Sequence, residues 1–188
     1  MKFWILALLL ATAGMGRASA DPLADLEQVR AAYGALHSVH AEITMSNGMA
    51  VSIDWIEPDK MHVVSSQNGM QMIAIGNNHW VNMGGHWTAL PPRANPIQTQ
   101  MAMMRGPEFD QQVLRNARIS DRGMDVLRGV PAHKYHLAGW EGAGGISYDL
   151  WIVNRLPVKA VEYGRAGEQE ATITYSRYNG VPDFGPPM

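Results

Sequence analysis

The first regular pattern of apolar positions lies in the segment that begins at Asp21 and Pro22. Asp21 is a residue type that caps helices, and Pro22 suits the first helical position. The segment is predicted to form a helix that ends near His37. Its apolar residues recur at spacings of three and four, which places them on one face: Leu26, Val29, Tyr33 and Leu36.

From residue 41 the apolar residues occupy every second position, which is typical of a strand with one buried face. Asn47-Gly48 is a strong signal for a tight hairpin turn. The outgoing strand has Ala41, Ile43 and Met45 on its apolar face, and the returning strand has Met49, Val51, Ile53 and Trp55. Four more short segments continue this antiparallel meander: residues 61–66, 70–75, 79–83 and 86–90.

Proline residues end the meander, and two short helical patterns follow it. The first places Ile97, Met101 and Met104 on one face, and the second, residues 108–116, carries Phe109, Val113 and Leu114. A sheet with this many strands curls or closes, and amphipathic helices bury their apolar sides against it. We therefore predict an α+β fold with one highly curved antiparallel sheet and a helical lid. The remaining strands are predicted at residues 119–122, 133–138, 147–153, 158–163 and 171–178.

The first twenty residues have the three parts of an export signal. Lys2 supplies the positive charge, residues 3–13 form an apolar run too short to span a bilayer, and Ala18-Ser19-Ala20 is a cleavage motif. The absence of cysteine closes the route to a lipid-anchored lipoprotein. We expect a periplasmic protein that is cleaved after Ala20 and whose residues 21–188 form a single domain.

The composition narrows the chemistry that the chain can perform. Its 188 residues are 46% hydrophobic and 17% charged, which is typical of a folded globular protein. The lack of cysteine excludes disulfides, zinc-thiolate sites, iron–sulfur clusters and a cysteine nucleophile. The formal net charge of −2 argues against a nucleic-acid partner, and no cofactor is implied.

Several groups of residues occur in an order that resembles a known family. After the leader and the first helix comes a hairpin with a tryptophan in its second strand, at residues 79–87. The later groups are Arg128–Ala132 before Tyr135–Leu137, Asp149–Ile152 before Leu156–Val158, and Thr172–Ser176 before Tyr178–Pro182. This order resembles the periplasmic lipoprotein-carrier (LolA-like) superfamily, which includes RseB-type regulators and mycobacterial lipid-binding lipoproteins. The resemblance covers most of the mature chain.

The resemblance implies an incomplete, strongly curved antiparallel β-barrel with a lid of short helices on its concave face. Acyl chains would lie between the sheet and the lid. Methionine suits such a cavity because its side chain is flexible, and burial of an acyl chain contributes about 0.8 kcal/mol per CH₂. The alternative is that the same residues form an ordinary core. The candidate lining residues are Met45, Val51, Ile53, Trp55, Met72 and Leu150 from the strands, and Met101, Met104, Phe109 and Val113 from the lid.

The patterns for catalysis and metal binding are weaker. The sequence contains no nucleophile elbow, zinc-protease motif or phosphate-binding loop, so we predict that the protein is not an enzyme. His133 and His136 are three residues apart, which puts them on opposite faces of a strand and argues against a joint metal site. Met70 and Met72 share a strand face, and thioethers of this kind select Cu(I).

The functional hypothesis is a non-catalytic periplasmic binding or carrier protein for a lipid or an acylated protein. Its partners would be the acyl chains of lipids or lipoproteins, together with a membrane-bound delivery or acceptor protein. Two alternatives stay open. One is a sensor or regulatory module that binds a partner protein, and the other is a copper carrier.

N-terminal sequencing of the exported protein tests the predicted leader. The expected first residue is Asp21, because signal peptidase cuts after a small-residue motif such as Ala18-Ser19-Ala20. Exported protein that still carries the first twenty residues would contradict this prediction.

Overall fold

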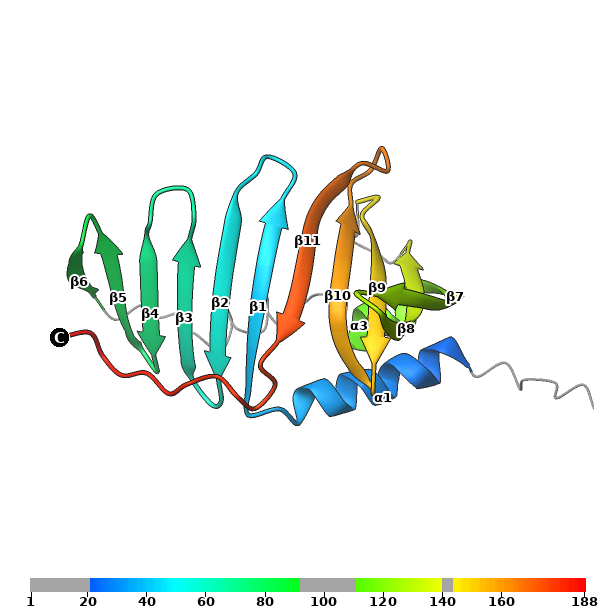
Figure 1. Cartoon of the computed structure of the whole chain (residues 1–188), viewed down its shortest axis with the longest axis horizontal. Coiled ribbons are helices and arrows are strands. Elements are labelled where there is room, and N and C mark those ends of the chain that lie inside the picture. The colour runs from blue at the N-terminus through cyan, green and yellow to red at the C-terminus, as the bar shows by residue number, and fades with distance from the viewer. Residues whose placement is uncertain (1–20, 92–110, 140–143) are drawn as a thin grey trace, which may run out of the picture.

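The computed structural model describes residues 21–91, 111–139 and 144–188, which form one antiparallel sheet of eleven strands with helices packed on it (Figure 1). The first half of the sheet is the predicted meander. Local alternation and tight turns are sufficient to specify it, because each strand pairs with its neighbour in sequence. Its strands are β1 (Ser38–Met45), β2 (Ala50–Ile56), β3 (Lys60–Ser65), β4 (Gln71–Ile75), β5 (Asn78–Met83) and β6 (His86–Leu90).

The second half of the sheet is another meander, which turns progressively along its length. In Figure 1 the strand β7 runs almost across the direction of β1. Within the described ranges, the edge strands β6 and β7 do not pair with each other, so the sheet is open. The strands are β7 (Arg118–Leu127), β8 (Val130–Ala138), β9 (Ser147–Val153), β10 (Leu156–Tyr163) and β11 (Gln169–Ser176).

The two meanders join where β1 pairs with β11. Ala41 lies opposite both Ile53 on β2 and Tyr175 on β11, and Leu150 lies opposite Ala160 two strands further on. Cross-strand partners point to the same side of a sheet. We call the side that carries Ala41, Ile53, Leu150 and Tyr175 the inner face, and the opposite side the outer face.

The helix α1 (Pro22–Gly34) closes one part of the inner face. The side chain of Asp21 caps it by accepting a hydrogen bond from the backbone N–H of Leu23 at 3.1 Å, as predicted. The predicted apolar face is also confirmed, since Leu26, Val29, Tyr33 and Leu36 are all buried in the main core. The helix ends at Gly34, before the expected His37, because the His37 N–H donates to the side-chain oxygen of Asn179 at 2.7 Å and is not available for a helical hydrogen bond.

A second helix, α3 (Gln111–Asn116), packs beside α1 and buries Leu114 completely in the same core. It is the described part of the predicted segment 108–116. The first predicted lid helix, with Ile97, lies outside the described residues. Among the residues that the structure describes, no helix is long and apolar enough to cross a membrane.

A side-chain hydrogen bond holds α1 against the sheet. The buried Tyr135 hydroxyl of β8 donates to the Asp25 carboxylate of α1 at 3.0 Å and lies 3.1 Å from Nδ1 of His133. On its other side, His133 lies 2.7 Å from the Asp121 carboxylate of β7. The helix position therefore depends on a polar chain that crosses β7 and β8, in addition to apolar packing.

Strand β7 differs most from its prediction, while β1, β8 and β10 begin two or three residues earlier than predicted. The short segment 119–122 is part of the longer strand β7, which continues to Leu127 through a bulge between Asp121 and Met124. Gly123 makes the bulge possible because its φ of 76° lies in the left-handed region, and its N–H donates to the Asp121 carboxylate at 2.6 Å. A bulge interrupts the alternation of inward and outward side chains, so the strand pattern in the sequence stops at residue 122 although the strand continues.

The C-terminal tail runs along one end of the first meander (Figure 1). The backbone N–H of Asn179 donates to the Ser38 carbonyl, and the Lys60 ammonium lies 2.5 Å from the Asp183 carboxylate. Phe184 packs on the ring of His62, with 5.8 Å between the ring centroids. The tail is extended, as its prolines predict, and it is tied to the ends of β1 and β3.

Replacing Tyr135 by phenylalanine tests the polar chain that holds α1. Tyr135→Phe should lower the free energy of unfolding by about 1–3 kcal/mol, because it leaves the Asp25 carboxylate and His133 without their shared partner. Urea unfolding measures the change. Tyr163→Phe is the control, since its partner Asp149 keeps hydrogen bonds from Lys134 and His136. Equal losses in the two variants would contradict the account.

Candidate functional site

Apolar side chains of the inner face form rows that cross the sheet from the second meander into the first. The register fixes these rows, because each residue lies beside its cross-strand partner. One row comprises Tyr175, Ala41, Ile53, Val63, Met72 and Val81. The next row comprises Ile173, Ile43 and Val51.

The part of the inner face near α1 and α3 is tightly closed. Leu137, Leu150 and Ala160 have no exposed surface, and Leu114 of α3 has almost none. The ring of Tyr33 meets that of Tyr175 edge to face, with centroids 5.9 Å apart. This region is an ordinary filled core in which the side chains already occupy the space between helix and sheet.

A second part of the inner face is less completely covered. Its apolar residues pack against the main core but keep partial exposure, and they lie on neighbouring strands: Ile43, Val51, Val63, Met72 and Ile173. We call these five residues the apolar strip. Because α1 packs mainly against β10, β7 and α3, it leaves the strip beyond its main area of contact.

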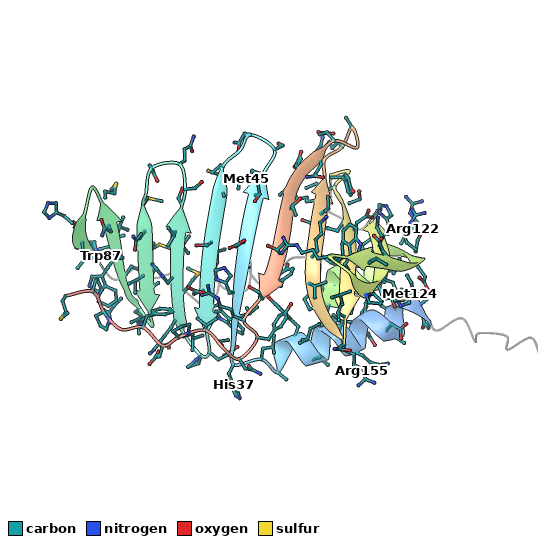
Figure 2. The ribbon with its side chains drawn as sticks, in the orientation of Figure 1. His37, Met45, Trp87, Arg122, Met124 and Arg155 are labelled. Atoms are coloured by element: carbon teal, nitrogen blue, oxygen red, sulfur yellow. The ribbon has the colours of Figure 1, made fainter. Side chains whose placement is uncertain are left out.

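The structure places all six strand residues predicted for the cavity on the inner face, but it divides them into two groups. Ile53, Trp55 and Leu150 belong to the closed core, with exposed fractions of 5%, 5% and 0%. Val51 and Met72 belong to the apolar strip. Met45 is also half-buried, near the end of β1 that leads into the β1–β2 hairpin (Figure 2).

The structure describes one of the four predicted lid residues, Val113. Val113 lies on α3 beside the buried Leu114 and is half-buried. Met101, Met104 and Phe109 lie outside the described residues, so the predicted contact between them and the strands stays a prediction.

Three residues of the apolar strip are absent from the predicted set, namely Ile43, Val63 and Ile173. Alternation marks each of them as facing one side of its strand. Their grouping depends on the β1–β11 and β2–β3 registers, which place Ile173 beside Ile43 and Val63 beside Ile53. The sequence shows which side of its own strand each residue faces, but it does not show which strands pair and bring the three residues together.

His79 adds one polar group to the inner face. Its side chain lies beside Ala74 and Leu90 in the sheet register and is 3% exposed. Among the described residues, no hydrogen-bond partner reaches its Nε2 atom. Buried polar atoms without a partner are rare in proteins, and this nitrogen is itself enclosed by the protein.

The histidines of β8 separate as predicted. His133 lies on the inner face, where it contacts the Tyr135 hydroxyl that donates to Asp25. His136 lies on the outer face, 2.7 Å from the Asp149 carboxylate. Within the described ranges, no group of three histidine or acidic side chains is arranged to hold a metal ion. Burial, together with the Asp25 carboxylate, raises the pKa of the Tyr135 hydroxyl, which therefore stays protonated at neutral pH and has a structural role.

Comparison with solved structures shows the same fold in other proteins. The crystal structure of the lipoprotein LppX from Mycobacterium tuberculosis matches with a TM-score of 0.65 and 18% identity, over 86% of this chain and 97% of LppX. LprF from Mycobacterium bovis matches with a TM-score of 0.63 and 17% identity, over 88% and 96% of the two chains. The comparison confirms the predicted fold, a curved antiparallel sheet that is not closed into a barrel, which LppX and LprF share.

A more distant match is MucB in its complex with MucA from Pseudomonas aeruginosa, with a TM-score of 0.51 and 15% identity. That alignment covers 86% of this chain and 56% of the other. No protein-family model matches the sequence, and no curated protein sequence matches it.

A pair of alanine variants distinguishes the closed core from the apolar strip. Leu150→Ala should lower the free energy of unfolding by about 2–5 kcal/mol, because Leu150 is completely buried and its removal leaves a cavity. Met72→Ala should cost clearly less, below about 1.5 kcal/mol, because the side chain is half-buried. Thermal or urea unfolding measures both changes. Equal large losses would mean that the strip is packed as tightly as the core.

Proposed function

We propose that this protein is an exported, non-catalytic binding protein that holds the acyl chain of a lipid or of an acylated protein on the inner face of its sheet. The observation that carries the proposal is the apolar strip, made of Ile43, Val51, Val63, Met72 and Ile173. These residues lie on five neighbouring strands, with Val51 and Val63 diagonal to each other, and all are apolar and only half-buried.

Burial of apolar surface provides enough free energy for this function. Each methylene group transferred from water contributes about 0.8 kcal/mol, so a six-carbon contact contributes about 5 kcal/mol before the cost of association. A row of branched side chains with one flexible thioether, Met72, is an apolar surface that adapts to chains of different shape. Such binding requires no nucleophile, metal or cofactor.

In this proposal the two groups of predicted residues have different roles. Met45, Val51 and Met72 contact the acyl chain, while Ile53, Trp55 and Leu150 belong to the filled core on the same face. The lid residues Met101, Met104, Phe109 and Val113 would cover the chain from the other side.

The likeness to LppX and LprF supports the proposal through the fold alone. Export to the periplasm is part of the proposal and rests on the leader sequence. The same fold occurs in MucB, which forms a complex with the protein MucA. Binding of a partner protein is therefore the alternative against which lipid binding is tested.

Two adjacent valines on β3 provide a matched test of the acyl site. Val63 points to the inner face and Val64 to the outer face, and both are half-buried. Val63→Trp should weaken the binding of a fluorescent fatty-acid probe about fifteenfold, because the indole displaces roughly two methylene groups, worth about 1.6 kcal/mol. Fluorescence titration of the mature protein measures the dissociation constant.

Val64→Trp is the control and should leave the affinity within about twofold, since its indole faces away from the proposed site. Circular dichroism and thermal unfolding check that both variants keep the fold. Equal weakening by the two substitutions, or no binding of the probe to the unmodified protein, would overturn the proposal and favour the partner-binding alternative.

A further inference from the structure

The outer face of the sheet carries a cavity of about 650 Å³ that is separate from the apolar strip. Its polar side is formed by alternate residues of β11, namely Thr172, Thr174 and Ser176. The register places Glu42 of β1 on one side of Thr174 and Lys159 of β10 on the other. Residues at these positions point away from the inner face, so the sheet itself separates the two sites.

The apolar side of the cavity comes from the second meander. Leu127 and Val130 form the last pair of the β7–β8 hairpin, and Val153 and Val158 contribute from β9 and β10. Leu127, Val153 and Val158 pack against a small outer-face core that contains Trp151. The cavity therefore has a row of hydroxyl groups along one side and branched apolar side chains along another.

The residues that line the cavity carry a net positive charge, whereas the whole chain has a net negative charge. Arg128, Lys159 and Arg177 line it together with a single carboxylate, Glu42, although the chain has a formal net charge of −2. His40 lies beside Glu42, with Nε2 at 3.5 Å from its carboxylate, and Nδ1 at 2.7 Å from Asp54. Concentrated positive charge in a partly enclosed, partly apolar space attracts anions.

None of these three cations has a carboxylate within ion-pair distance among the described residues. The ammonium group of Lys159 lies 4.7 Å from the centre of the Trp151 ring, and the indole N–H of that ring donates to Asp125 at 2.7 Å. This hydrogen bond orients the indole and, through it, the lysine. Lys159 is thus held at the cavity on the Trp151 ring, near the Asp125 carboxylate, whose pKa is lowered by the Trp151 hydrogen bond and also by this lysine, while Arg128 and Arg177 form no ion pair with a described residue.

From this combination we propose that the outer-face cavity is a second binding site, which takes a small organic anion with a short apolar chain. The carboxylate or phosphate group of the ligand lies near Lys159 and Arg128 and accepts hydrogen bonds from the threonine hydroxyls. Its apolar chain lies against Leu127 and Val130. The cavity volume is within the range of small-molecule sites. This site does not depend on acyl binding at the inner face.

Isothermal titration with octyl phosphate, below its micelle concentration, tests the site. The unmodified protein should bind the probe, and Arg128→Gln and Lys159→Gln should each weaken binding by about tenfold or more, because each removes one charge that contacts the anion. Octanol should bind far more weakly because it lacks the charge, and inorganic phosphate because it lacks the chain.

Arg122→Gln is the matched control for Arg128→Gln, since Arg122 lies on the same hairpin but does not line the cavity, and Figure 2 shows it at the edge of β7. This variant should bind octyl phosphate normally, and so should Val63→Trp, which alters the inner face.

Three results would overturn the proposal. One is the absence of octyl phosphate binding. Another is equal weakening by Arg122→Gln and Arg128→Gln, which would show a general effect of net charge. The third is weakening by Val63→Trp without any effect of Arg128→Gln and Lys159→Gln, which would place the probe on the inner face.

Discussion

The pairing of β1 with β11 is the interaction on which the rest of the structure depends. It runs in continuous antiparallel register from His40 opposite Ser176 to Met45 opposite Ala171 and joins two meanders that are otherwise built from sequence neighbours. Without it, Ile43 and Ile173 would belong to separate sheets. With it, their side chains are adjacent, and the apolar strip continues across the middle of a single sheet.

The same pairing has a different consequence on the outer face. There it places His40 and Glu42 beside Ser176 and Thr174, and so it builds the polar side of the second cavity. Because side chains alternate along a strand, one register determines both faces at once. The inner face becomes apolar and is partly closed by α1, while the outer face carries hydroxyl groups and positive charge.

Local parts of this architecture could be predicted from the sequence. The Asp21 cap, the apolar face of α1 and the Asn47-Gly48 hairpin each depend on residues close together in the chain, and the structure contains all three. The β1–β11 pairing joins residues more than 120 positions apart and has no local signal. Burial was also ambiguous for β9, where residues 148–152 are all buried because both faces are covered. Leu150, which was predicted to line the cavity, belongs to the filled core. The half-buried Val63, which lies in the apolar strip, was not predicted.

Native mass spectrometry of the mature protein, purified from the periplasm without denaturant, tests the central claim most directly. The account predicts a complex whose mass exceeds that of the polypeptide by the mass of a lipid or an acylated protein, and it predicts that Val63→Trp reduces this species while Val64→Trp retains it. A bare polypeptide, a bound metal ion, or a complex with a protein that lacks an acyl chain would contradict it.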